Sequence, residues 1–87
     1  MAQAGSLESG DVFVTIEPME TDEPEIELES LVMEQYGRQI LETIRRILTE
    51  HHVKKVKLTV RDRGALDYAI RSRVETVLIR AGWEGLK

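Results

Sequence analysis

Apolar residues recur in this chain with two different periods, and these periods restrict the folds that it can adopt. In residues 12–17, 25–29 and 55–61 apolar and polar residues alternate, which is typical of strands with one buried face. In two longer segments the apolar residues recur every three or four positions, as on one side of an amphipathic helix. The predicted order of elements is therefore strand, strand, helix, strand, helix (ββαβα).

The outward positions of the predicted strands differ in charge. Pro18 ends the first strand, and an acidic turn over residues 20–24 leads to the second strand, whose outward positions are Glu25, Glu27 and Glu29. We expect the first and second strands to form a hairpin. The third strand carries cations on its outward side, at Lys57 and Arg61 among others. A basic row of this kind also favours an acidic strand beside it.

Each predicted helix has boundary signals as well as an apolar stripe. Ser30 is a suitable N-cap for the first helix, because its hydroxyl can accept a hydrogen bond from a free backbone N–H, and this helix is expected to end near His51. A turn at Asp62 or Gly64 leads to the second helix, for which Gly82 is a natural stop. The first stripe contains Met33, Tyr36, Ile40, Ile44, Ile47 and Leu48. The second contains Leu66, Ala69, Ile70, Val74, Val77, Leu78 and Ala81.

These elements assemble most economically as an α+β two-layer sandwich, a three-stranded mixed sheet with both helices on one face. The second and third strands are expected to be parallel and joined by a right-handed crossover through the first helix. We favour the first strand as the central one, and direct pairing of the second and third strands is the alternative that their charges support. Residues 1–11 are predicted to be a flexible arm, and residues 12–87 a single domain.

Composition excludes several classes of function. With 87 residues and only 5% aromatic side chains, the chain can build a small core but hardly an enclosed catalytic cavity. The net charge of −4 argues against a nucleic-acid binder. The absence of cysteine excludes a disulfide, a thiol nucleophile and a cysteine-based zinc site. No signal peptide or membrane-spanning stretch is recognisable, so we expect a cytoplasmic protein.

The predicted arm contains the segment Gly5-Ser6-Leu7-Glu8-Ser9-Gly10-Asp11, in which a serine precedes a glycine. An accessible serine beside a glycine suits a modification site, because glycine lets the backbone enter the active site of another protein. Taken alone, the segment is equally what a solvated N-terminal arm contains. A serine hydrolase is excluded, because a serine nucleophile needs a nearby base and a third group that orients the base.

Two separate motifs resemble those of the citrate lyase acyl carrier proteins, the gamma subunits of that enzyme. Residues 6–12 are similar to the Thr-Leu-Glu-Ser-Gly-Asp-Val segment of the family, with Ser6 in place of threonine. The second match resembles the family pattern Asp-x-Gly-Ala-Leu-Asp, Arg-x-Arg-x-Glu, Arg-Ala. Its positions here are Asp62, Gly64, Ala65, Leu66, Asp67, Arg71, Arg73, Glu75, Arg80 and Ala81. The similarity covers nearly the whole chain, except for a shorter and different tail after Ala81.

The resemblance implies a carrier subunit without catalytic residues of its own. In the family, the serine that matches Ser9 is joined through a phosphodiester to a phosphoribosyl dephospho-CoA group, which is derived from triphosphoribosyl dephospho-CoA. The thiol of this arm carries acetyl and then citryl groups as thioesters. The implied partners are the transferase (alpha) and lyase (beta) subunits, the prosthetic-group transferase and the acetylating ligase.

Three alternatives to a citrate lyase carrier stay open. The carrier of citramalate lyase is near-identical in pattern. The carrier of malonate decarboxylase has a Ser-Gly-Asp segment but lacks the preceding Leu-Glu and the Gly-Ala-Leu-Asp match. A protein-interaction module that carries no group at all is the alternative from another functional class.

The residues around Ser9 are candidates for supporting roles. Glu8, Gly10 and Asp11 flank it, and the two carboxylates either orient the hydroxyl and contact the modifying enzyme or are solvated charges. Ser6 is a competing hydroxyl, but the resemblance and the adjacent Gly10 favour Ser9.

Arg73 lies at the edge of the second apolar stripe, where a cation is expected to be paired. Asp11, Asp62 and Asp67 are its candidate partners, and the functional alternative is a contact with the phosphodiester or with a partner subunit. Arg71 and Arg80 are expected to point further outward.

Two further features are interpreted structurally. The adjacent histidines at positions 51 and 52 do not share a helix face, so no metal site is predicted there. Trp83 is expected either to cap the core or to mark a contact surface.

Overall fold

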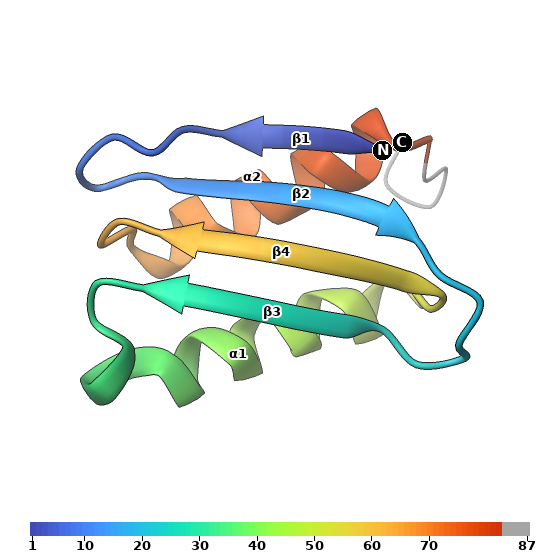
Figure 1. Ribbon diagram of the computed structural model, residues 1–87, viewed down its shortest axis with the longest axis horizontal. Helices are drawn as coiled ribbons and strands as arrows, with labels where there is room; N and C mark the ends of the chain where they lie inside the picture. Colours follow the sequence, from blue (N-terminus) through green and yellow to red (C-terminus); the bar gives the residue numbers. More distant parts are fainter. Residues whose placement is uncertain (83–87) are drawn as a thin grey trace.

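The structure is a computed structural model, and it describes residues 1–82. Six elements follow one another along the chain: β1 (Ala2–Gly5), β2 (Val12–Pro18), β3 (Glu25–Ser30), α1 (Met33–Glu50), β4 (Val56–Asp62) and α2 (Asp67–Arg80). The strands form one sheet in the order β1-β2-β4-β3, and both helices cover the same face of it (Figure 1). The predicted two-layer α+β class is confirmed, with four strands in place of three.

The sheet is mixed, as expected, but its order differs from the one we favoured. β3 and β4 are parallel neighbours, whereas β2 pairs antiparallel with β4 and does not form a hairpin with β3. β4, and not β2, is therefore the strand that lies between the other two predicted strands, β2 and β3. The charges explain this order: Glu25 lies opposite Lys57, and Glu29 lies opposite Arg61. Pairing β2 with β3 would instead place the outward Glu17 near the glutamate row.

The fourth strand comes from the segment that was predicted to be part of a flexible arm. Residues 2–5 form β1, which pairs antiparallel with β2 and places Ala2 opposite Ile16 and Ala4 opposite Val14. Ala4 is only 2% exposed, so its methyl group belongs to the core. Alanine and glycine give no strand signal in the sequence, because their side chains are too small to produce an alternation of large apolar groups.

The core lies between the sheet and the helices, where α2 packs on β1 and β2 and α1 packs on β3. Its fully buried members come from the inward strand positions and from one stripe on each helix. The largest are Ile44, Ile47, Leu48, Leu58, Ile70 and Leu78. Three large residues that were expected in the stripes, Met33, Tyr36 and Leu66, are instead exposed, at 43%, 53% and 63%. Each belongs to the first turn of its helix or directly precedes it. Ala81, which was also expected in the second stripe, is exposed directly after the end of α2.

The start of α1 also differs from the prediction. Val32, and not Ser30, occupies the N-cap position, and Ser30 is the last residue of β3. The Ser30 hydroxyl donates to Asp62 Oδ2 at 2.7 Å and accepts the N–H of Val32 at 3.1 Å. It therefore connects the ends of β3 and β4 and stabilises the turn before the helix. Gly82, with a φ of 88°, follows the end of α2 as predicted.

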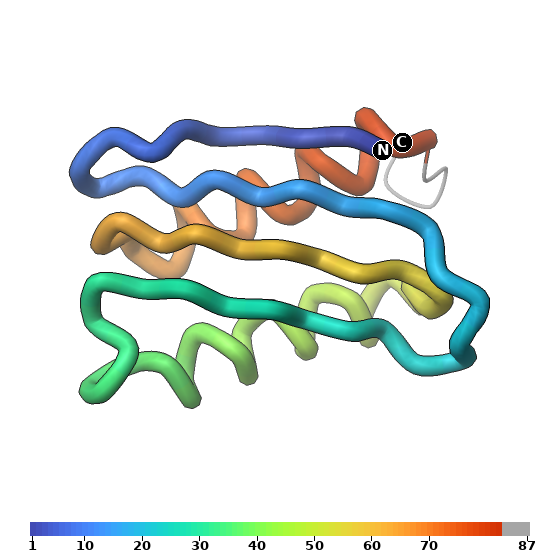
Figure 2. Tube along the Cα trace, in the orientation of Figure 1, coloured from blue at the N-terminus to red at the C-terminus, as the bar shows by residue number. Residues whose placement is uncertain are grey.

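One end of the sandwich collects several chain turns, as the continuous trace in Figure 2 shows. The β1–β2 connection, the ends of β3 and β4 and the starts of both helices all lie there. We call this region the Ser9 end and define it as residues 6–11, 31–36 and 63–68. Trp83 lies outside the described residues. Within those residues, neither helix combines the length and apolar character needed to cross a membrane.

Candidate functional site

Ser9 lies at the corner of a tight turn between β1 and β2. The N–H of Asp11 donates to the carbonyl oxygen of Glu8 at 3.0 Å, which closes a four-residue turn with Ser9 and Gly10 in its central positions. Gly10 has a φ of 82°, and a positive φ at the third position is what a type II turn requires. Ser9 is exposed, and its hydroxyl makes no hydrogen bond within residues 1–82. The turn therefore presents this hydroxyl to other molecules.

The turn is anchored to the end of β4. The N–H of Gly10 donates to the carbonyl oxygen of Arg63 at 2.7 Å, and the N–H of Arg63 donates to the carbonyl oxygen of Asp11 at 2.9 Å. These two bonds continue the antiparallel pairing of β2 and β4 beyond the strand ends. Since β1 holds the other side of the connection, the segment carrying Ser9 is attached at both of its ends.

Asp11 is the central polar group of this connection. Its carboxylate accepts hydrogen bonds from Nε and Nη2 of Arg73, each at 3.0 Å, and from the Ser6 hydroxyl at 2.7 Å. It also accepts the N–H of Val12 at 2.7 Å. These hydrogen bonds lower the pKa of the Asp11 carboxyl from 3.8 to about 2, and those from Arg73 have the largest effect, followed by those from Ser6 and Val12. Of the three carboxylates considered as partners for Arg73, the structure selects Asp11.

Gly5 is a structural requirement of the site that our sequence interpretation missed. Its φ is 87°, and a Cβ at this position would lie 1.8 Å from the carbonyl oxygen of Val12. Only glycine allows the two backbones to approach this closely. The signal in the sequence was that Gly5 directly precedes the polar segment that leads to the strand beginning at Val12.

The surroundings of the Ser9 turn are open at Gly10. A Cβ built on Gly10 would meet no atom within 4 Å. On the helix side a shallow groove of about 350 Å³ runs along the start of α2, lined by Gly10, Asp11, Tyr68, Ala69, Ser72 and Arg73. The Ser9 turn therefore has open space beside Gly10 and a groove on the side of α2.

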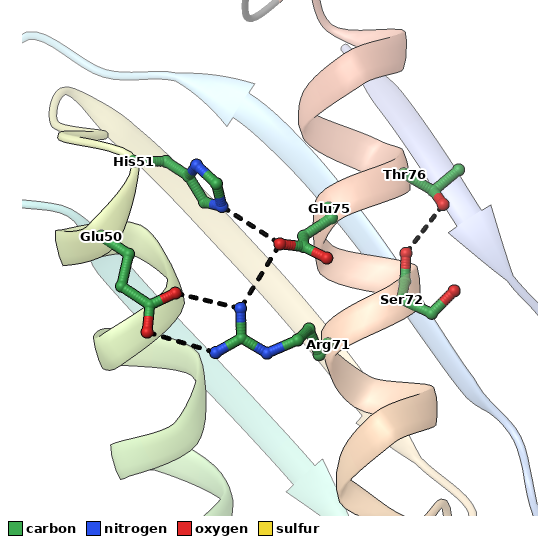
Figure 3. A network of polar contacts seen from close by, with 6 residues as sticks. All are labelled: Glu50, His51, Arg71, Ser72, Glu75 and Thr76. Atoms are coloured by element: carbon green, nitrogen blue, oxygen red, sulfur yellow. Dashed lines mark hydrogen bonds and ion pairs between the residues drawn. The ribbon is translucent and has the colours of Figure 1, made fainter. Parts of the chain in front are cut away.

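The other arginines of the second motif connect elements of the scaffold. Arg71 binds both carboxylate oxygens of Glu50, at 3.0 and 3.3 Å, and also contacts Glu75 at 3.4 Å (Figure 3). His51 Nε2 lies 3.1 Å from the same Glu75 carboxylate. The hydrogen bonds with Arg71 lower the pKa of Glu50, and those with Glu50 raise the pKa of Arg71. This network ties the end of α1 to α2.

Arg80 and Asp62 of the second motif also have structural contacts. Arg80 donates from Nη1 to the carbonyl oxygen of Gln3 at 2.9 Å, which fastens α2 to β1. Asp62 is fully buried and accepts the Ser30 hydroxyl and the Ala65 N–H. Within residues 1–82 no group of three or more His, Cys, Asp or Glu side chains is arranged to hold a metal ion. The structure therefore brings Arg73 to Asp11, which follows the Ser9 turn, whereas His51 lies against Glu75.

Comparisons with known proteins identify the family of the chain. The citrate lyase acyl carrier protein 1 of Salmonella paratyphi A is 42% identical over 81 residues, which are 93% of this chain and 83% of that protein. A chain of the Pseudomonas malonate decarboxylase hetero-tetramer, crystallised in complex with malonate, has the same fold. It matches with a TM-score of 0.77 and 22% identity, over 93% of this chain and 82% of that one. The family model for acyl carrier proteins described as malonate decarboxylase delta subunit (MdcD) matches residues 1–81, and the chain belongs to this acyl carrier family.

Proposed function

We propose that this chain is the acyl carrier subunit of a citrate lyase, with a phosphoribosyl dephospho-CoA group joined to Ser9. The observation that carries the proposal is an exposed serine hydroxyl at the corner of a turn that is anchored on both sides. The 42% identity to a citrate lyase acyl carrier protein supports the choice of complex. The chain itself would be non-catalytic and would work in the cytoplasm.

The prosthetic group would supply the thiol that this cysteine-free chain lacks, and that thiol would carry the acetyl and citryl groups. The residues of the chain have a different task, which is to present one hydroxyl in a defined place. Arg73 and Asp11 hold the turn, and Gly10 provides its backbone conformation. The proposed partners are the transferase and lyase subunits, the prosthetic-group transferase and the acetylating ligase.

Hydrogen bonding supports Ser9 over Ser6 as the attachment residue. The Ser6 hydroxyl donates to Asp11 at 2.7 Å and accepts the N–H of Glu8 at 3.3 Å, so it is part of the connection that holds the turn. Esterifying it would remove the hydrogen that it donates to Asp11. The Ser9 hydroxyl can be esterified at no such cost. Arg73, with its side chain 41% exposed, keeps a secondary role as a candidate contact for the phosphodiester.

The test is the intact mass of the chain after co-expression with the prosthetic-group transferase. The wild-type chain should gain the mass of the group, and Ser9→Ala should gain nothing while keeping its circular dichroism spectrum. Ser6→Ala is the matched control and should keep most of the attachment. Attachment to Ser9→Ala at normal stoichiometry would refute the assignment. Unmodified wild-type chain in cells with active transferase would favour the interaction module.

The family assignment also supports a second candidate complex. The matching family model is described by the malonate decarboxylase delta subunit. The Leu7-Glu8 pair and the Gly64-Ala65-Leu66-Asp67 segment favour the citrate lyase type. Reconstituting the modified carrier with each set of partner subunits and assaying citrate, citramalate and malonate would decide among the three.

A further inference from the structure

A groove of about 510 Å³ lies at the end of the sandwich opposite to the Ser9 end. The start of β1, the end of β2, the start of β4 and the end of α2 meet there (Figure 1). The apolar residues that line the groove are Met1, Ile16, Pro18, Val56, Leu78 and Ala81. Ile16 and Leu78 belong to the buried core, whereas Met1 is 90% exposed. The groove therefore leads from the core to an apolar side chain that is open to water.

The end of α2 has the geometry of a motif that pairs an apolar residue beyond a helix with one inside it. Gly82 follows the C-cap residue Ala81 and has a φ of 88°. Its N–H donates to the carbonyl oxygen of Ile79 at 2.9 Å, which is one of the two backbone hydrogen bonds of a Schellman motif. In this motif the residue after the glycine frequently makes an apolar contact with the helical residue five positions before it. Those two positions hold Trp83 and Leu78, and Leu78 lines the groove.

The rim of the groove complements the charge of the residue that follows Trp83. The lining includes three exposed basic residues, His52, Lys54 and Lys55. The two lysines make no side-chain hydrogen bond or ion pair within residues 1–82, and Glu17 is the one carboxylate that lines the groove in this part of the chain. The sequence continues from Trp83 with Glu84. An indole followed by a carboxylate therefore matches an apolar groove with a mainly cationic rim.

We propose that Trp83 packs into this groove against Leu78, with Glu84 at the lysine rim. The size is suitable for an indole ring, because pockets that hold small molecules measure roughly 300–1,000 Å³. The ring covers the apolar side of Met1 and joins the end of α2 to the start of β1. β1 is an edge strand with β2 as its one neighbour in the sheet, so this contact holds it from the helix side. The inference is independent of the carrier function.

Fluorescence tests the burial of the indole, because Trp83 is the only tryptophan in the chain. Indole emission moves to shorter wavelength when the ring leaves water. The folded chain should therefore emit at a shorter wavelength than the urea-unfolded chain, and acrylamide should quench it severalfold less.

A nitroxide label tests the location of the ring, and the absence of cysteine allows labelling at a single chosen position. A nitroxide on Lys54→Cys, in the lining of the groove, should quench the emission of Trp83 strongly relative to a diamagnetic label at the same position. Glu34→Cys is the matched control. Glu34 is exposed in the first turn of α1, at the Ser9 end, so a nitroxide there should quench the emission little.

Substitutions test the two contacts separately. Trp83→Ser should lower the midpoint of urea unfolding, whereas Trp83→Phe should keep most of the wild-type stability, because phenylalanine retains an aromatic ring for the groove. Glu84→Lys should increase acrylamide quenching at low ionic strength, and the increase should shrink as salt screens the charges. Glu42→Lys, an exposed position of α1 outside the groove, is the charge control and should leave the quenching unchanged.

Three results would overturn the inference. The first is emission and quenching of the folded chain equal to those of the unfolded chain, and the second is equal quenching by the two nitroxide labels. The third is a short-wavelength emission that is lost on dilution, which would assign the groove to the tryptophan of a second copy of the chain. None of these results changes the expected mass of the chain modified at Ser9, so the two proposals fail independently.

Discussion

The ion pair between Arg73 and Asp11 should stabilise both the fold and the turn that presents Ser9. It joins a residue near the middle of α2 to the start of β2, and it does so through two parallel hydrogen bonds of 3.0 Å. Two-point contacts between a guanidinium and a carboxylate are the strong form of this interaction. We therefore expect a measurable coupling energy between the two side chains, in contrast to an ordinary surface pair.

The pKa of Asp11 sets the scale of this coupling. Lowering the pKa from 3.8 to about 2 corresponds to at most roughly 2.5 kcal/mol of stability. The Arg73 side chain is 41% exposed and that of Asp11 is 19% exposed, so solvent screens part of the interaction. We expect a coupling energy of about 1 kcal/mol. Because the pKa is lower in the folded state, this stability is complete above about pH 4 and is lost as the pH falls towards 2.

The assay is a double-mutant cycle of Asp11→Asn and Arg73→Gln, measured by urea unfolding at pH 7 and again near pH 2.5. The coupling should be complete at the higher pH and clearly smaller at the lower one, where it is partly lost. The pair of Lys57 and Glu27, which has a single contact of 3.6 Å between charged atoms and a Glu27 side chain that is 67% exposed, is the control and should couple by less than about 0.5 kcal/mol. Equal coupling in the two cycles, or a coupling for Asp11 and Arg73 that does not change with pH, would refute the reasoning.

Two further pairs of substitutions test the scaffold by thermal and urea unfolding. Gly5→Ala should cost more than about 2 kcal/mol, because its Cβ would lie 1.8 Å from the Val12 carbonyl oxygen at a φ that already disfavours alanine. Gly10→Ala is the control, and because Gly10 is in open space this substitution should cost only about 1 kcal/mol. Equal losses of stability would mean that the close approach at Gly5 is absent. Ile70→Ala should cost about 2–5 kcal/mol because Ile70 is 1% exposed. Leu66→Ala should cost less than about 1 kcal/mol, and a loss as large as that of Ile70→Ala would contradict the exposed position of Leu66.

The sequence was sufficient to predict those elements whose apolar residues are large. Three strands and both helices were found because Val, Ile and Leu alternate or recur at helical spacing in them. β1 was missed because its inward side chains are the methyl groups of Ala2 and Ala4, whose burial becomes evident only when β2 and α2 are in place. The strand order was also missed, because hairpin pairing is the usual expectation for consecutive strands, and here the opposite charges on β3 and β4 prevail.

The candidate site was only partly predictable for a related reason. Accessibility of Ser9 follows from the small polar residues around it, and the structure agrees that Ser9 is exposed. The choice of Asp11 as the partner of Arg73 depends on a contact across 62 positions of the sequence, and spacing along the helix gives no information about it. The exposure of Leu66 and Tyr36 was not predictable either, because both fit an apolar stripe and only the structure shows where each stripe leaves the core.

The contact between Asp11 and Arg73 also explains why the two sequence motifs belong together. The first motif contains the hydroxyl that we propose is modified, and the second contains no group that reaches it for chemistry. Instead, its Arg73 holds the first motif, Asp62 secures the turns at the ends of β3 and β4, and Arg80 binds the backbone of β1. A carrier needs its attachment serine accessible but fixed in relation to the surface that partners recognise. The second motif fulfils this need: its arginines hold both sides of the connection that contains the Ser9 turn.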